Sequence, residues 1–304
     1  MSFKRIMITG GSGRVGEFVI KELAKDYELI VLDVNKPKNI PENIHYKFIQ
    51  KNIKEIKEIK EAFRDIDVVI HLAAIPVDLP GLGQEILELN VMGTFNLLEA
   101  MVKNGVKKLV FASSMCAIIN CFCKEKSFVP DYFPVDEDHP SRSNDFYGLS
   151  KVIGEEICHA FSRKNNMSAI CLRLGSILFP DGGEGTKNDV SRYAKPELGK
   201  HVIWTYVDVR DVAQAFRLSL KKLEKEDVGY EIYNIGANDV LSRTDSLDLI
   251  RQYYQEVKLI SNENGFLIDK KRALFNISKA KEKLGYEPLH NWEEYLNIYP
   301  EIRI

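Results

Sequence analysis

The sequence lacks both a disulfide framework and a long apolar run. Its five cysteines are odd in number and irregularly spaced over 304 residues, so we expect no set of structural disulfides and a reducing, cytoplasmic location. Apolar stretches such as 68–75 and 109–119 fall short of the roughly 18 residues that span a bilayer. The first residues do not resemble a secretory signal. We therefore expect no membrane partner.

Net charge is also nearly absent. The chain has 42 Lys and Arg against 44 Asp and Glu, a formal charge of -2, so no large field attracts a nucleic acid. A metal site is not expected either, because the six histidines show no ligand-pair spacing and the cluster Cys116, Cys121 and Cys123 has no fourth ligand nearby. We expect these cysteines to be neutral packing residues near the substrate pocket.

Apolar runs do occur, and they alternate with amphipathic segments. Strands are predicted at 3–9, 28–33, 45–49, 67–72, 107–113, 169–174, 205–209 and 230–235. Helices are predicted at about 14–25, 53–63, 86–100, 145–164 and 211–223, and a loop at 180–185. This alternation predicts an α/β fold with a doubly wound parallel sheet. We predict that 1–174 and 204–236 form this domain, and that 175–203 and 237–304 form a smaller C-terminal α/β lobe that binds the substrate.

A glycine turn follows the first strand and opens the first helix. Two overlapping glycine spacings fit a dinucleotide-binding Rossmann turn, G-x-G-x-x-G at Gly11, Gly13 and Gly16 and G-x-x-G-x-x-G starting at Gly10. Missing side chains let backbone amides approach a pyrophosphate, and the helix N-terminus adds partial positive charge. The predicted cofactor-binding residues here are Gly10, Ser12, Gly13, Arg14, Val15 and Gly16. The alternative is a tight turn that binds nothing.

Asp33 ends the second strand, 17 residues after Gly16. An acid at this place accepts hydrogen bonds from the adenosine ribose hydroxyls and repels a 2'-phosphate. The next residue is Val34 rather than a compensating arginine. The sequence therefore favours NAD over NADP, although alone Asp33 could be an ordinary turn residue.

Candidate catalytic residues lie near the start of the helix predicted at 145–164 and at the end of the fifth predicted strand. Tyr147 and Lys151 are one helical turn apart on the same face, and a cation there favours the phenolate of a tyrosine whose ordinary pKa is about 10. Lys151 could also hold the nicotinamide ribose. Ser114 ends the fifth strand, at the sheet edge where ligands bind. The alternatives are a surface Tyr and Lys pair and a small residue closing a strand.

Together these motifs resemble the extended short-chain dehydrogenase/reductase family, specifically the NAD-dependent epimerase/dehydratase group. The resemblance runs from Phe3 to about Pro288 and rests on 9–16, Asp33, 71–74, 90–94, Ser113, Ser114, 147–151, 173–175, 206–213 and 284–288. It implies that Tyr147 is the general acid/base, that Lys151 lowers its pKa and that Ser114 orients the reacting oxygen.

The resemblance also implies further cofactor contacts. Leu72, Ala73 and Ala74 would pack along NAD, Asn90 would lie close to the catalytic centre, and Ile53 would approach the adenine. Asn52 stands where many relatives carry Asp, and its amide oxygen can still accept a hydrogen bond from adenine. Helices around 84–104 and 146–165 resemble the pair through which relatives form homodimers.

The second lobe departs from the nucleotide-sugar epimerases. They usually carry an Asn after the Arg-Leu strand, but the corresponding stretch 173–180 has none, and 199–205 contains no arginine for a diphosphate. Met115 and Cys116 replace the acidic pair of dehydratases. We therefore expect an NAD-dependent oxidoreductase acting on a hydroxyl or carbonyl of a small polar substrate, a sugar or sugar-acid derivative. The alternatives are a nucleotide-sugar epimerase with regenerated NAD and a non-enzymatic NAD-sensing protein.

Overall fold

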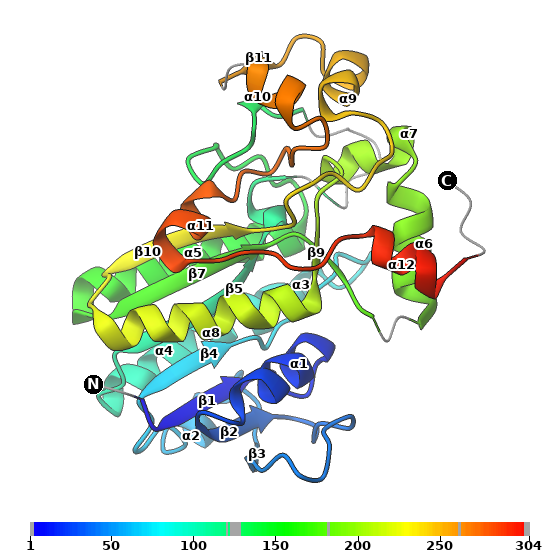
Figure 1. The fold of residues 1–304 in the computed structure, drawn as a ribbon. Coiled ribbons are helices and arrows are strands. Elements are labelled where there is room, and N and C mark those ends of the chain that lie inside the picture. The colour runs from blue at the N-terminus through cyan, green and yellow to red at the C-terminus, as the bar shows by residue number, and fades with distance from the viewer. Residues whose placement is uncertain (1–2, 120, 122–128, 181–182, 261–262, 301–304) are drawn as a thin grey trace. The chain divides into compact units, whose positions relative to one another are not determined.

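A seven-stranded sheet forms the centre of the protein in a computed structural model that describes residues 3–119, 121, 129–180, 183–260 and 263–300. The strand order is β10-β7-β5-β4-β1-β2-β3 (Figure 1). The strands are β1 (Arg5–Thr9), β2 (Glu28–Asp33), β3 (Lys47–Gln50), β4 (Val68–His71), β5 (Lys108–Ser114), β7 (Ser168–Leu174) and β10 (Tyr230–Ile235). Neighbours from β5 through β3 pair in parallel. The predicted α/β class is confirmed.

The chain divides into two compact units. Unit 1 comprises Met1–Ser113, Leu149–Leu172 and Ala213–Ile232, and unit 2 comprises Ser114–Gly148, Arg173–Val212 and Tyr233–Ile304. The division by function into a cofactor domain and a substrate lobe stays a prediction. Among the described residues, none of the helices combines the length and the apolar character needed to cross a membrane.

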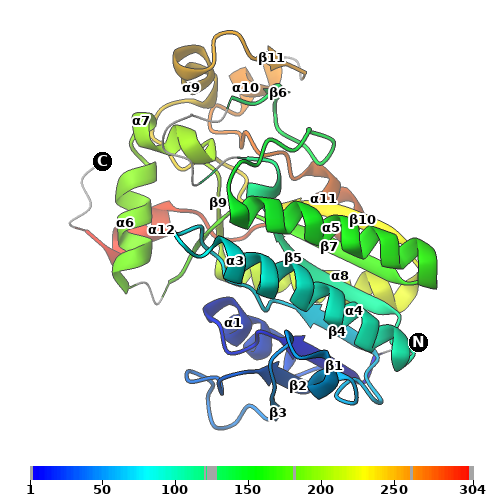
Figure 2. The same cartoon turned by 180° about the vertical axis from the view of Figure 1, so that it is seen from behind.

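Helices cover both faces of the sheet in unit 1. Helices α1 (Arg14–Leu23) and α8 (Val209–Lys225) lie on one face (Figure 1), and α4 (Gly93–Lys103) and α5 (Phe146–Asn165) lie on the other (Figure 2). Because both faces are covered, β1 and β4 consist almost entirely of buried residues. The coverage of both faces explains why the sequences of β1 and β4 are nearly continuous apolar runs.

The helix predicted at 86–100 is divided into three parts. A short helix α3 (Gly83–Ile86) passes into a π-helical segment at Leu87–Met92 before α4 begins. Such widened turns often occur at functional sites, and this one contains Asn90. The helix predicted at 53–63 is also wrong in length, because regular helix α2 covers only Ile56–Ile59.

Unit 2 consists of short elements. Its strands are β6 (Tyr132–Phe133), which pairs with β11 (Lys258–Leu259), and β8 (Ser176–Leu178), which pairs in parallel with β9 (Tyr206–Asp208). Its helices are α6 (Gly183–Tyr193), α7 (Pro196–Gly199), α9 (Ser246–Tyr253), α10 (Asn264–Ile268), α11 (Ser278–Leu284) and α12 (Glu293–Ile298), with 3-10 turns at Met115–Ala117 and Lys200–Val202. The prediction of a loop through 185 is wrong, because α6 begins at Gly183.

Candidate active site

The glycine turn is shaped by close approaches of the backbone. Gly10 has a φ of 72°, and a Cβ there would lie 2.3 Å from the backbone nitrogen of Ala73. The amide of Gly13 donates to the carbonyl of Gly10 at 3.1 Å. Beyond it, Arg14 is exposed and Val15 half-buried in the first turn of α1. Only glycine fits position 10, as a pyrophosphate cradle at a helix N-terminus requires.

The side chain of Asp33 is held by hydrogen bonds beside this turn. Its Oδ2 accepts from the amide of Ser12 at 3.0 Å, and its Oδ1 accepts from the amides of Val34 and Asn35 at 2.7 and 3.3 Å. The hydroxyl of Ser12 donates to the carbonyl of Asn35. Both carboxylate oxygens of Asp33 are thus held by the backbone, while the residue itself is only half-buried.

The residues predicted near adenine differ in what their side chains do. Asn52 is half-buried, and its Oδ1 accepts from the amide of Lys54 at 3.0 Å. Ile53 is 3% exposed and belongs to the hydrophobic core. A Cβ at Gly93 would lie 2.8 Å from its Cδ1. The side chain of Ile53 is therefore a packing group, and only one lone pair of the Asn52 oxygen is engaged by the hydrogen bond from Lys54.

Asn90 joins two segments that border the end of β4. Its Oδ1 accepts from the amide of Ile75 at 2.8 Å, while its Nδ2 donates to the carbonyl of Ile75 and to Ser150 Oγ, both at 3.0 Å. Asn90 is 3% exposed. The half-buried residues Leu72, Ala73 and Ala74 lie in the chain between the end of β4 and Ile75, which Asn90 holds. The side chain of Asn90 thus fixes the segment in which these three residues lie.

His71 lies in a neutral buried network beneath the same edge. Its Nδ1 is 2.8 Å from Thr9 Oγ1, and its Nε2 is 3.0 Å from Thr94 Oγ1. Complete burial, and to a smaller extent the charge of Lys151, lowers the pKa of His71 to about 3. The imidazole is consequently neutral in the folded protein at physiological pH, and its role is to join β1, β4 and α4.

Lys151 and Glu155 tie α5 to β5. Lys151 is 4% exposed, its Nζ donates to the carbonyl of Ala112 at 2.8 Å, and it lies 5.1 Å from the centre of the Phe111 ring. One turn later, Glu155 accepts from Ser113 Oγ at 2.5 Å. The position of the Lys151 ammonium group is thus fixed from the strand side.

Ser114 and Tyr147 interact within unit 2. Both are buried, and Ser114 Oγ also accepts from the amide of Cys116 at 3.1 Å. Burial raises the pKa of Tyr147, the neighbouring Cys116 adds to this, and the hydrogen bond with Ser114 opposes it. Tyr147 and Lys151 occupy successive turns of α5 on one face. Ser114 is therefore the neighbour that lowers the pKa of Tyr147, and Lys151 places a cation one turn away.

The sequence argument missed Gly148, which lies between this tyrosine and lysine. A Cβ at Gly148 would lie 2.1 Å from Ser143 Oγ and 2.4 Å from the carbonyl oxygen of Cys116. Its amide donates to Asp145 Oδ1 at 2.7 Å, which caps the start of α5. A glycine inside a predicted helix was the available signal.

The cysteines show no shared ligand geometry. Cys116, Cys158 and Cys171 are buried and Cys121 is half-buried, each as a free thiol. Cys123 lies outside the described residues. Within the ranges that the structure describes, no three His, Cys, Asp or Glu residues form a group that could hold a metal ion.

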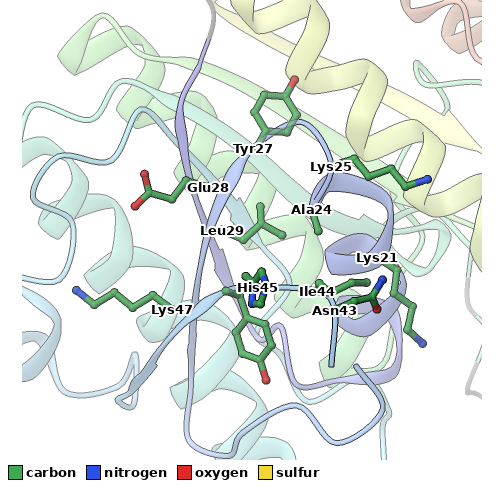
Figure 3. Close-up of a pocket in the computed structure, with 11 residues that line it drawn as sticks. Lys21, Ala24, Lys25, Tyr27, Glu28, Leu29, Asn43, Ile44, His45 and Lys47 are labelled. Atoms are coloured by element: carbon green, nitrogen blue, oxygen red, sulfur yellow. The ribbon is translucent and has the colours of Figure 1, made fainter. Parts of the chain in front are cut away.

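A separate hollow of about 530 Å³ lies where β2 and β3 begin, at the opposite end of β2 from Asp33. Its lining includes Lys21, Lys25 and Lys47. Figure 3 shows the amines of these lysines pointing in different directions, away from the hollow. Because the cations do not converge, the hollow offers no focused site for an anion.

Known proteins resemble this chain along most of its length. A family model described as "NAD dependent epimerase/dehydratase family" matches residues 6–236. A protein of Methanocaldococcus jannaschii named "Putative UDP-glucose 4-epimerase" is 31% identical, with 93% of each chain covered. Uronate dehydrogenase of Pseudomonas putida is 28% identical over 57% of this chain and 61% of its own. The crystal structure of UDP-glucose 4-epimerase from Thermotoga maritima with UDP-glucose is 25% identical, covers 98% of this chain and 100% of its own, and gives a TM-score of 0.69.

Proposed function

The chain belongs to the NAD dependent epimerase/dehydratase family, and from this we propose that it is an NAD-dependent oxidoreductase acting on a hydroxyl or carbonyl group of a small sugar or sugar acid. The observation that carries the proposal is the placement of Ser114 and Lys151 around Tyr147: Ser114 hydrogen-bonds the phenol, and Lys151 lies one turn along α5. A binding protein that only senses NAD needs none of these three groups.

We place NAD along the edge formed by the ends of β1, β2 and β4. The proposed contacts are Gly10, Ser12, Gly13, Arg14, Val15 and Gly16 for the pyrophosphate, Asp33 for the ribose, Asn52 and Ile53 for the adenine, and Leu72, Ala73, Ala74, Asn90, Tyr147 and Lys151 toward the nicotinamide. The cradle at Gly10, which a Cβ would fill, supports this placement. Because the Ile53 side chain is in the core, its contact with adenine would come from its backbone. Asn90 would act through the segment it holds.

The chemistry then follows from three side chains. NAD, when bound, supplies the acceptor for a hydride or, reduced, its donor. Tyr147 removes the proton of the substrate hydroxyl in oxidation and returns it in reduction, and Ser114 Oγ holds the reacting oxygen by a hydrogen bond. Burial raises the pKa of Tyr147 and the hydrogen bond with Ser114 lowers it, and the positive charge of Lys151, one turn along α5, would further favour the phenolate. Turnover in the oxidation direction should accordingly increase with pH.

The second lobe supports a small substrate. The stretch 173–180 contains no Asn and 199–205 contains no Arg, whereas a substrate that carries a diphosphate should need such polar and cationic contacts. The likeness to uronate dehydrogenase also supports a sugar-acid substrate.

A nucleotide-sugar epimerase with regenerated NAD is the second candidate. The relative from Methanocaldococcus jannaschii supports it, because 31% identity extends over 93% of both chains. The same Tyr147, Lys151 and Ser114 would serve both reactions. The candidates differ in whether reduced cofactor accumulates.

We also propose that the protein is a cytoplasmic homodimer. Met92, Phe95 and Val102 lie three to seven residues apart along 92–102 and are 52%, 38% and 37% exposed, and Leu149 on α5 is 40% exposed. The Phe95 and Phe161 rings pack at 5.6 Å, which joins α4 to α5. A second copy would cover these apolar side chains. Sedimentation as a monomer at micromolar concentration contradicts the dimer. The free thiols support the cytoplasmic location.

The decisive experiment measures reduced-cofactor absorbance with NAD during a screen of sugars, uronic acids, sugar alcohols and nucleotide sugars. Tyr147→Phe should lower turnover of any substrate found by about 10³-fold and leave the Kd for NAD unchanged. Tyr46→Phe, in the separate hollow, is the matched control. Full activity of Tyr147→Phe contradicts the mechanism. Isomerisation of nucleotide sugars alone, without accumulated reduced cofactor, favours the epimerase.

A further inference from the structure

Glu17 is a buried carboxylate directly after the glycine turn. It lies in the first turn of α1 and is only 6% exposed. A buried carboxylate is unfavourable unless hydrogen bonds or a counter-charge compensate it. Its charge also suits the helix N-terminus. The role of Glu17 is therefore to be found in its partners.

The partners of Glu17 all lie in the loop that follows β2. Its Oε1 accepts from the amides of Lys38 and Asn39, each at 2.9 Å, and its Oε2 accepts from Asn39 Nδ2 at 2.9 Å. Burial raises the pKa of Glu17, but the hydrogen bonds from Asn39 and Lys38 together lower it by more. Glu17 is thus charged at neutral pH, and it is the backbone of Lys38 that meets it.

This loop begins at the residue proposed to hold the adenosine ribose. Asp33 ends β2, and the following Asn35 is held by Ser12 and by Asp33 itself. Glu17 holds the next part of the loop, and Pro37 between the two is buried. Residues 33–39 are consequently attached at two points to the glycine turn and to α1. Without Glu17, only the attachment of Asn35 to Ser12 and Asp33 is left.

We propose that Glu17 is a positioning residue for the adenosine half of NAD, which acts by holding residues 35–39 and so keeping the Asp33 carboxylate directed at the ribose. The inference rests on the proposed cofactor site. It concerns a residue that contacts the loop rather than the cofactor. Loss of the Glu17 side chain should therefore lower the affinity for every ligand that carries the adenosine ribose, by the same factor for each.

The test measures Kd by calorimetry for NAD and for ADP-ribose, together with hydrogen exchange of the amides at 35–39. Glu17→Ala should raise both Kd values by about tenfold and speed exchange of the Asn39 amide. Glu17→Gln keeps Oε1 as an acceptor, so its effect should be smaller, about threefold. A change for NAD without one for ADP-ribose overturns the proposal, because it places the defect at the nicotinamide end.

Two other variants keep the test decisive. Glu22→Ala, on the same helix, removes a contact of 2.6 Å with Arg217 on α8 and should leave both Kd values unchanged. Asn39→Ala removes the side-chain hydrogen bond to Glu17 Oε2 and leaves the two from the backbone. It should raise both Kd values, by less than Glu17→Ala, and it provides the test also if Glu17→Ala fails to fold. Wild-type Kd values in folded Glu17→Ala or in Asn39→Ala overturn the inference. Failure of the wild-type protein to bind NAD contradicts the cofactor site itself.

Discussion

Buried polar side chains serve different purposes in the two compact units. In unit 1, the chain of contacts from Thr9 through His71 and Thr94 to Asn90 contains no carboxylate and holds the backbone at one edge of the sheet. In unit 2, the carboxylates of Asp208 and Asp211 are buried. Asp208 accepts from Tyr295 Oη at 2.7 Å, and Asp211 accepts from the amides of Leu289 and His290, both at 3.0 Å.

The two sets of buried side chains differ in what they hold in place: one borders the proposed ligand site, and the other holds a distant segment of the chain. The neutral network of unit 1 includes Thr9, which directly precedes the glycine turn proposed to hold NAD. The carboxylates of Asp208 and Asp211 instead fix residues 289–295 near Tyr206, whose hydroxyl accepts from the amide of Trp292 at 2.9 Å. Changes beside the glycine turn should therefore alter NAD binding, and changes at Asp208 or Asp211 should alter stability alone.

The strongest test of this comparison is Gly10→Ala. The variant brings a Cβ to 2.3 Å from the Ala73 nitrogen, so we expect a loss of more than about 4 kcal/mol in the free energy of unfolding and loss of NAD binding. Gly105→Ala is the matched control, because Gly105 has the same φ of 72° with no atom within 4 Å. It should lose about 1 kcal/mol. Similar urea midpoints for the two would show that the close approach is unimportant.

The next test uses the acid sensitivity of unit 1. The pKa of His71 is about 3 in the folded protein against 6.5 for the ordinary side chain. As pH falls below 6.5, the unfolded chain binds the proton first, so stability is lost down to about pH 3. The loss should reach about 3 kcal/mol by about pH 4. In His71→Gln, urea unfolding should show a smaller acid loss, while His45→Gln, at an exposed site, should follow the wild type.

The outlines of the strands could be predicted better than the helices. The predicted bounds 28–33 and 230–235 are those of β2 and β10. For β2 the reason is that a strand covered on both faces is an almost continuous apolar run. The π-helical turn around Asn90 could not be predicted. An apolar pattern of period 3.6 reports which face is buried and does not register a local shift in hydrogen bonding.

The candidate site divides in the same way. Gly10 and Asp33 could be found because their signal is local: a spacing within a turn and an acid at a strand end. Glu17 could not, since its partners at 38 and 39 lie 21 and 22 residues away and a charged residue on a helix is ordinarily solvated. In unit 2, the partners of Asp208 and Asp211 are about 80 residues distant. No sequence pattern specifies contacts at that separation.

The smallest expected effect has the opposite sign and belongs to unit 2. Burial raises the pKa of Asp239 to about 6, although the Tyr206 hydroxyl donates to it at 2.5 Å. Because the folded pKa lies above the ordinary aspartate value of 3.8, the carboxyl favours folding when protonated, and this contribution is lost as pH rises through about 6. Partial exposure reduces the effect to about 1 kcal/mol. Asp239→Asn cannot ionise, so urea unfolding at about pH 5 and pH 8 should show a smaller loss of stability than in the wild type. Asp248→Asn, at an exposed site on α9, should show the wild-type loss. An unchanged pH dependence in Asp239→Asn would remove the contrast in sign between Asp239 and His71.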